Sequence, residues 1–241
     1  CRHDNEAFAR AYLGHYLKAK TSQVHLDLDE QFHQPMSVSE LPREHAKSAR
    51  ALIDVLKGIC FREFDYGVYC RATDTLATET IDDVRIELEQ NEQIQDDFGD
   101  LVGGRKWTQH RFVTTTGIQL RGIGAFAKVR GIKQRQHRPD RLWVDDLEDD
   151  EHVLSEEIRA KLDRWFHRSL LNILAEKARI SVIGTPLHQH ALIEKLRASG
   201  KYAVLYRPCF SEKLVKGQLV RVPLWPEVWP MARLDERRAQ I

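Results

Sequence analysis

A dense run of carboxylates follows directly on a short apolar segment. Residues 142–151 read Leu-Trp-Val-Asp-Asp-Leu-Glu-Asp-Asp-Glu, which places six carboxylates within seven positions. A short apolar run of this kind predicts a buried strand. Carboxylate oxygens are preferred ligands of hard divalent cations, and open α/β sheets bind their ligands at the carboxyl ends of the strands. The segment therefore predicts a metal-binding edge of a sheet.

The carboxylates of this run suggest different roles. Asp145 follows the apolar residues directly and is the candidate for holding the metal ion. Asp146 and Glu148 are both candidates for aligning or deprotonating a water, because side chains two apart on a strand share a face whereas adjacent ones do not. A solvated charge run at the start of a helix is the alternative. That alternative accounts well for residues 149–151 and poorly for the two aspartates that follow the apolar segment.

A lysine and a hydroxyl stand together earlier in the chain, at the predicted start of a helix. The segment reads Pro42-Arg43-Glu44-His45-Ala46-Lys47-Ser48. In a phosphate-binding loop, backbone N–H groups surround the phosphates, a lysine reaches the β and γ oxygens, and a Ser or Thr hydroxyl binds Mg²⁺. Lys47 and Ser48 fit the last two roles, although Leu41 and Ala46 stand where the usual glycines would be. An ordinary helix start is the alternative. Together with the acidic strand, the pair indicates metal-assisted nucleotide hydrolysis.

Two other groups of residues bear on the site. Gly184-Thr185-Pro186 ends a predicted strand, and if that strand neighbours the acidic one, Thr185 lies beside the carboxylates and can sense the γ-phosphate. A simple Gly-Pro turn is the alternative. His188 and His190 are two apart, which does not place them on one helical face, and no third ligand accompanies them. We therefore do not expect a zinc site.

The composition is that of a folded globular protein. The chain has 241 residues, of which 42% are apolar and 30% charged, enough for one large α/β domain or two small ones. The net charge is +1, but residues 121–141 contain seven basic side chains and one carboxylate. Some of these, such as Lys128, Lys133 and Arg135, are candidates for contacting phosphate groups. The alternative is that they face solvent or the acidic run.

The cysteines and the apolar segments indicate the compartment. The four cysteines show no metal-ligand or redox spacing, which indicates a reducing environment. No stretch approaches ~20 apolar residues, so we expect no membrane span and see no signal-peptide pattern. Because the numbering begins at Cys1 rather than methionine, we expect the chain to start inside a longer protein or after processing.

Alternating apolar periodicities predict the fold class. Strands are expected over residues 36–41, 66–70, 142–144, 180–183 and 202–206, with a hairpin over 112–114 and 118–120. Helices are expected over residues 6–18, 24–32, 46–56, 74–89, 155–176 and 191–198, with Asp74 as an N-cap. Strands that alternate with helices indicate an α/β fold with a mostly parallel sheet, flanked by helices on both faces.

Taken in order, these residues resemble the ATPase domain of the tailed-bacteriophage large terminase subunit, the motor that pumps DNA into procapsids. That family has a phosphate loop of the form Pro-Arg-x-x-(Gly/Ala)-Lys-(Ser/Thr), which residues 42–48 match. Other similarities are Arg130-Gly131, Arg138-Pro139-Asp140, Gly184-Thr185-Pro186 as the coupling motif, Leu224-Trp225-Pro226-Glu227 before the family's nuclease domain, and Phe8-Ala9-Arg10-Ala11-Tyr12 followed by Val24-His25. The resemblance covers nearly the whole chain.

The resemblance implies a P-loop ATPase core of the ASCE type, with ATP and Mg²⁺ as its ligands. The loop residues that would surround the phosphates are Arg43, Glu44, His45, Ala46, Lys47, Ser48 and Ala49. Ser48 and Asp145 would hold the metal ion, and Thr185 would link hydrolysis to movement. Arg130 resembles the arginine finger that is supplied to the ATP of a neighbouring subunit. His25 and Gln31 are candidates for contacting the adenine.

Two departures from the family pattern leave alternatives open. Family members often have glutamate directly after the first acid, where this chain has Asp146, so the catalytic carboxylate is either Asp146 or Glu148. The stretch between Arg130 and Asp145 is longer than in some members. Arg135 and Arg138 are therefore alternatives for the finger.

The resemblance also implies an organisation and partners. Residues 1–35 would form a helical, adenine-side segment, 36–216 the ATPase core, and 217–241 a linker toward a nuclease domain. The protein would be a Mg²⁺-dependent ATPase of the host cytoplasm and the procapsid portal vertex. Its partners would be double-stranded DNA, a homo-oligomeric ring of this chain (a pentamer on the portal), the portal protein and the small terminase subunit. The alternatives are a helicase-like ATPase stimulated by nucleic acid and a degenerate nucleotide-binding module.

Overall fold

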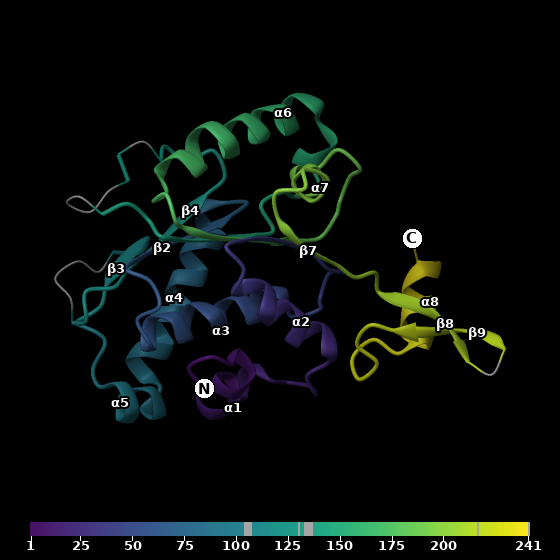
Figure 1. Ribbon diagram of the computed structural model, residues 1–241, viewed down its shortest axis with the longest axis horizontal. Helices are drawn as coiled ribbons and strands as arrows, with labels where there is room; N and C mark the ends of the chain where they lie inside the picture. Colours follow the sequence, from purple (N-terminus) through teal and green to yellow (C-terminus); the bar gives the residue numbers. More distant parts are fainter. Residues whose placement is uncertain (104–107, 130, 133–136, 216, 241) are drawn as a thin grey trace.

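A mostly parallel sheet of seven strands organises the computed structural model (Figure 1), which describes residues 1–103, 108–129, 131–132, 137–215 and 217–240. The strands lie in the order β3-β4-β2-β5-β6-β1-β7. Their bounds are β1 Met36–Glu40, β2 Tyr66–Arg71, β3 Arg111–Val113, β4 Gln119–Gly124, β5 Arg141–Asp145, β6 Arg179–Gly184 and β7 Ala203–Tyr206. β3 and β4 form the predicted antiparallel hairpin, and the other neighbouring pairs of this sheet are parallel.

Helices cover both faces of the sheet (Figure 1). On one face lie α1 Asn5–Tyr12, α2 Gln23–Phe32, α3 Lys47–Cys60, α4 Asp74–Gln90 and α5 Glu92–Phe98, and on the other lie α6 Glu156–Trp165 and α7 Leu192–Ala198. β5 is buried on both faces: Trp143 belongs to the core on the first side, and Leu142 and Val144 to the core on the second. A strand buried on both faces reads as a continuous apolar run. The predicted fold class is confirmed.

The strand order determines which loops meet. β1 leads to the lysine loop and β5 ends in the acidic run, and β6 lies between them, parallel to both. Val182 of β6 pairs with Val38 on one side and Val144 on the other. The carboxyl ends of the three strands therefore meet at one edge of the sheet. The expected neighbourhood of the Gly184-Thr185-Pro186 strand and the acidic strand is confirmed.

Two predicted helices are shorter than expected. The helix predicted over 155–176 ends at Trp165 and continues as a π turn, Phe166–Leu170, and a 3₁₀ turn, Leu171–Ile173. Phe166 and Leu170 are fully buried through this change, so the apolar periodicity persists although the hydrogen bonding shifts. The helix predicted over 6–18 ends at Tyr12. The remaining 3₁₀ turns are Gly14–Tyr16, which follows it, and His152–Leu154.

The start of α4 differs from the prediction by one residue. Thr73 has extended backbone, and its hydroxyl accepts the Leu76 N–H at 3.2 Å, so Thr73 rather than Asp74 is the N-cap. Asp74 is the first helical residue, and its carboxylate accepts the Gly124 N–H at 2.7 Å. Both residue types make good caps. Asp74 does not act as the cap because its carboxylate accepts the hydrogen bond from Gly124.

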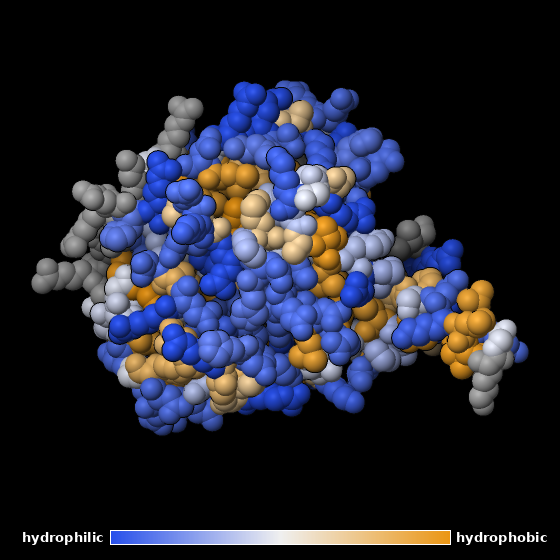
Figure 2. Space-filling model, in the orientation of Figure 1, coloured by the Kyte–Doolittle hydropathy of each residue, from blue (hydrophilic) through white to orange (hydrophobic). Residues whose placement is uncertain are grey.

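The carboxyl-terminal segment forms its own hairpin. β8 Phe210–Val215 and β9 Gln218–Pro223 pair antiparallel and project from the sheet, with α8 Met231–Ala239 beside them (Figure 1). Leu214 and Leu219 form a cross-strand pair near the tip and are 72% and 70% exposed, which gives the apolar patch at the far end of the hairpin in Figure 2. The predicted boundary at 216/217 falls between β8 and β9, which pair with each other. The division of the chain into segments 1–35, 36–216 and 217–241 stays a prediction. Within the described residues, no helix has the length and apolarity needed to cross a membrane.

Candidate nucleotide-binding site

The loop between β1 and α3 has a strained backbone. Ala46 has φ +56° and ψ +22°, and Glu44 has φ +60°, both in the left-handed region. For a residue with a Cβ this conformation costs on the order of 1–2 kcal/mol. Ala46 stands where the usual phosphate loop has a glycine, which explains the usual preference. The loop is tied to the sheet where the Leu41 N–H donates to the Gly184 carbonyl at 3.1 Å.

Lys47 begins α3 and reaches back across this loop. Its Nζ donates to the Thr185 Oγ1 at 2.8 Å, to the Pro42 carbonyl at 2.9 Å and to the Leu41 carbonyl at 3.3 Å. Burial lowers the pKa of Lys47, and the negative charges of Asp146 and Asp145 act against this. The three hydrogen-bond acceptors are neutral. The amine is thus held at the strand edge as a cation whose charge is balanced only by nearby carboxylates.

Asp145 is completely buried at the end of β5. Its Oδ2 accepts the Tyr69 hydroxyl at 3.0 Å and lies 3.6 Å from the Arg71 Nε. Burial and the neighbouring Asp146 raise the pKa of Asp145, while Arg71, the Ser48 hydroxyl and Tyr69 lower it. Oδ1 is buried without a hydrogen-bond partner of ordinary geometry in the described structure. An orphaned carboxylate oxygen beside a hydroxyl is a suitable pair of ligands for Mg²⁺.

Asp146 and Glu148 reach the same edge of the sheet because the chain turns after β5, and not because they alternate along a strand. β5 ends at Asp145, and Asp146 has φ +43°, so the chain turns there. The Asp146 Oδ1 accepts the Thr185 N–H at 3.1 Å. The Glu148 Oε2 accepts the Leu192 N–H at 2.8 Å, at the start of α7, and burial raises the pKa of Glu148.

Lys47, Asp146, Glu148 and Thr185 line one cavity of about 450 Å³, whereas the buried Asp145 is not among its lining residues. Of the predicted site residues, those that line it are Arg43, Glu44, Ala46, Lys47, Ser48, Ala49, Asp146, Glu148 and Thr185. Asp149 and Asp150, predicted as a solvated run, also line it, and the half-exposed Arg43 guanidinium donates to Asp150 at 2.6 Å.

The side chains of two other predicted residues, His45 and Arg138, are not among those that line the cavity. The His45 side chain is 1% exposed and points away from the cavity, stacked on Trp229 at 6.1 Å between ring centroids. Its backbone belongs to the loop, and its place among the residues that surround the phosphates stays a prediction. Arg130 and Arg135 lie outside the described residues. Arg138 precedes β5, at the end of that strand opposite to Asp145.

Arg71 was not among the predicted site residues, yet it lines the cavity from the end of β2. Its Nε has no hydrogen-bond partner in the described structure, and its Nη1 donates to the Thr80 Oγ1 at the long distance of 3.5 Å. The sequence carries a usable signal, because Arg71 directly follows a predicted strand just as Asp145 does. The signal becomes specific only when β2 is known to neighbour β5.

A second, more apolar cavity of about 470 Å³ shares Glu44, Ala46 and Ala49 with the first. Tyr16, Leu17, His25, Ile53 and Trp225 are among its other lining residues. Burial lowers the pKa of His25 to about 4, so the ring is neutral, and its Nδ1 accepts the Ser22 N–H at 3.0 Å. Gln31, the other adenine candidate, lines neither cavity.

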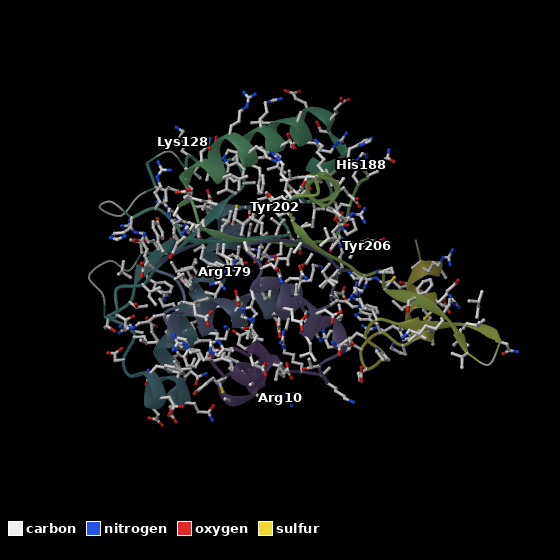
Figure 3. The ribbon with its side chains drawn as sticks, in the orientation of Figure 1. Arg10, Lys128, Arg179, His188, Tyr202 and Tyr206 are labelled. Carbon is white, nitrogen blue, oxygen red and sulfur yellow. The ribbon has the colours of Figure 1, made fainter. Side chains whose placement is uncertain are left out.

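Among the described residues, no metal site made only of protein side chains accompanies the cavity. In the described parts of the chain, no group of three or more His, Cys, Asp or Glu side chains is arranged to hold a metal ion. The rings of His188 and His190 lie 5.5 Å apart, with His188 beside α7 (Figure 3). Mg²⁺ is normally held by one or two carboxylates together with substrate phosphates, so the chemistry of Ser48 and Asp145 fits such a site without a third protein ligand.

Solved structures share this architecture, whereas no family model and no curated protein matches the sequence. The ATPase domain of the large terminase of Thermus phage P74-26 is 16% identical, with a TM-score of 0.55 over 94% of this chain and 91% of that one, and a mutant of it gives 0.56. S. cerevisiae Dbp5, in a structure that includes ADP, gives 0.52 at 12% identity over 83% of this chain. A DEAD box protein from Methanococcus jannaschii gives 0.50 at 11% over 80%. This chain spans about half of the last two, 51% and 53%.

At these identities the likeness concerns the fold. The strand order, the lysine loop after β1 and the acidic end of β5 all agree with it. The chain therefore has the P-loop ATPase fold, and its structure is similar to that of a phage large terminase ATPase domain, as the motifs led us to expect.

Proposed function

We propose that this chain hydrolyses ATP with Mg²⁺ and thereby drives double-stranded DNA into a viral procapsid, as the ATPase domain of a large terminase. One observation carries the proposal: Lys47, Asp146 and Thr185, from the loops that follow three parallel strands, line one cavity, and the buried Asp145 ends the strand just before Asp146. The likeness to the terminase domain in fold supports the packaging role over other uses of the same core.

The residues around the cavity fit the requirements of phosphoryl transfer to water. Lys47 would set its positive charge against the β and γ phosphates. The Ser48 hydroxyl and the unpartnered Asp145 oxygen would hold Mg²⁺, which when bound neutralises phosphate charge. Asp146 is the better placed of the two candidate carboxylates to align the water, because one hydrogen bond joins it to Thr185 and a second joins Thr185 to Lys47. Glu148 is instead engaged with α7.

The second cavity suits the base of the nucleotide. It adjoins the phosphate loop, is mostly apolar, and is lined by aromatic rings from both ends of the chain, among them Tyr16 and Trp225. Apolar walls with a few polar groups are typical of sites for planar ligands. His25 is neutral there, so it would contact a base without adding charge.

The remaining partners follow from the same proposal. Lys128 is exposed and would contribute to non-specific contacts with DNA phosphates, together with Lys133 and Arg135, which lie outside the described residues. A ring of this chain on a portal, a small terminase subunit and a nuclease domain would complete the motor in the host cytoplasm and at the portal vertex.

Stimulation by duplex DNA tests the proposal. Wild-type protein should hydrolyse ATP only with Mg²⁺, faster when duplex DNA is added, and the stimulation should fall steeply as salt rises. Phosphate release is measured with duplex, single-stranded or no DNA. A chain that binds no labelled ATP at all would instead be a degenerate nucleotide-binding module.

A helicase-like ATPase is the second candidate, and the fold match to the M. jannaschii DEAD box protein favours it. In that case single-stranded nucleic acid should stimulate hydrolysis more than duplex does, and strand separation should be detectable with a labelled duplex. Both candidates use the same cavity, so the nucleic-acid preference decides between them.

Hydrolysis should depend on contact between subunits. An arginine supplied in trans raises the rate roughly 10³- to 10⁵-fold in related systems, so the rate per subunit should increase with protein concentration. Arg130→Ala should remove this increase. Mixing Arg130→Ala, which keeps its own lysine, with Lys47→Met, which keeps its arginine, should restore phosphate release. An arginine in trans would be contradicted by a rate per subunit that does not change with protein concentration, together with no restored phosphate release in the mixtures. The mixtures combine Lys47→Met with Arg130→Ala, Arg135→Ala or Arg138→Ala.

A further inference from the structure

Two tryptophans from the carboxyl-terminal segment lie near the phosphate loop: Trp225 lines the second cavity, whereas Trp229 packs on the loop and lines neither cavity. Trp229 is 3% exposed, and its Nε1 donates to the Glu44 carbonyl at 3.3 Å. Its ring stacks on His45 with an interplanar angle of 9°. The Arg237 Nη1 lies 3.1 Å from the Glu44 Oε1. Glu44 is therefore held through both its backbone and its side chain by residues nearly two hundred positions later in the chain.

The segment that makes these contacts is anchored independently of the loop. The Trp225 Nε1 donates to the Lys20 carbonyl at 2.9 Å, and its ring meets His25 edge-on at 4.5 Å. The Leu224 carbonyl accepts the Ser22 hydroxyl at 2.8 Å. We refer to residues 224–237 as the tryptophan segment. It is bound to the amino-terminal part of the chain through Leu224 and Trp225, and it contacts the loop through Trp229.

The loop needs support of this kind because of its sequence. Glu44 and Ala46 both have left-handed backbone without being glycine, and such a conformation persists only where the surroundings enforce it. Glu44, one of these two residues, is the one that Trp229 and Arg237 grip. His45 lies between them, with its Nδ1 2.9 Å from the Arg43 carbonyl and its ring on Trp229.

We propose that the tryptophan segment is a positioning element that holds the phosphate loop in its phosphate-binding conformation, in place of the glycines that the loop lacks. Trp229 and Arg237 act through Glu44 and His45 and do not themselves contact the nucleotide. The inference rests on the proposed nucleotide binding. By linkage, a nucleotide that requires this loop conformation also stabilises the tryptophan segment, so displacement of the segment lowers nucleotide affinity.

Hydrogen exchange of the loop and affinity for Mg·ATP test this together. In Trp229→Ala, the amides of residues 43–48 should exchange faster in protein without nucleotide, since exchange reports local opening. The Kd for Mg·ATP should rise about tenfold, which corresponds to ~1.4 kcal/mol. Arg237→Ala should shift both readouts in the same direction by less. Leu214→Ser, at the exposed hairpin tip of the same carboxyl-terminal part, should change neither.

A glycine in the loop should rescue the defect. Ala46→Gly relieves one left-handed position without removing a partner of the tryptophan segment, so Trp229→Ala with Ala46→Gly should recover most of the affinity and of the protection. Trp229→Phe keeps a ring on His45 and serves if the alanine variant does not fold. Unchanged loop exchange in the Trp229 and Arg237 variants would overturn the inference, and so would faster exchange throughout the chain without rescue. If wild-type protein binds no ATP, the proposed function fails, while loop exchange still tests the positioning role.

Discussion

Lys47→Met will abolish most ATP hydrolysis, with kcat/KM lowered by roughly 10²- to 10³-fold or more, as for the loss of one group that stabilises transition-state charge. The free energy of unfolding without nucleotide should be unchanged or higher. Lys47 is 5% exposed, and its amine donates only to neutral oxygens among the hydrogen bonds of the described residues. Burial therefore disfavours the charge of the amine. Methionine retains the length of the apolar stem and removes that charge.

Opposite effects on activity and stability distinguish a functional lysine from a structural one. Phosphate release and urea denaturation are measured on the same preparations. Lys201→Met, at an exposed lysine, is the matched control and should leave both quantities unchanged. A Lys47→Met protein that hydrolyses ATP at the wild-type rate would end the assignment of this loop. A large loss of stability would show that the amine mainly holds the loop to β6.

The sheet was predictable from sequence because its central strands are buried on both faces. A run such as the one ending at Val144 has few interpretations once polar residues bound it. Helix ends were less predictable. The π turn at Phe166–Leu170 keeps apolar side chains against the sheet, so periodicity alone continues the helix through it. At α4, Thr73 and Asp74 are both good caps, and a hydrogen bond to Gly124, fifty positions away, is what engages Asp74.

The site was predictable where residues follow a strand directly and less so where loops turn. Lys47, Asp145 and Thr185 meet because their strands are parallel and neighbouring, which the alternating pattern implies. The conformation of Asp146 and the left-handed backbone at Glu44 are set by tertiary contacts that no local pattern encodes. The rotation of His45 toward Trp229 is of the same kind, since it depends on a segment at the other end of the chain.

The buried ion pair between Asp54 of α3 and Arg141 of β5 joins the helices on one face to the sheet. The Asp54 Oδ2 accepts the Arg141 Nη2 at 2.8 Å and the Trp143 Nε1 at 2.9 Å, and its Oδ1 accepts the Asn5 Nδ2 at 3.2 Å. Arg141 also donates to the Ser181 Oγ at 2.9 Å. Burial alone would raise the pKa of Asp54, but the charge and hydrogen bond of Arg141, together with the Trp143 N–H and the charge of Lys57, outweigh it, so the pKa is lowered. The network connects α1 and α3 to β5 and β6.

Asp54→Leu or Arg141→Met alone should lower the free energy of unfolding by roughly 3–5 kcal/mol, because each leaves a buried charge without its partner. The double variant should be closer to wild type than either single one, since it removes both charges. Arg221→Ala breaks the exposed Arg221–Asp235 pair and should cost less than about 1 kcal/mol. Urea denaturation measures all four.

Because the pKa of Asp54 is lowered on folding, the contribution of Asp54 to the free energy of unfolding is present above the ordinary carboxyl pKa of 3.8 and is lost as the pH falls below it. Single variants that cost no more than Arg221→Ala would show that this pair does not hold the two layers together.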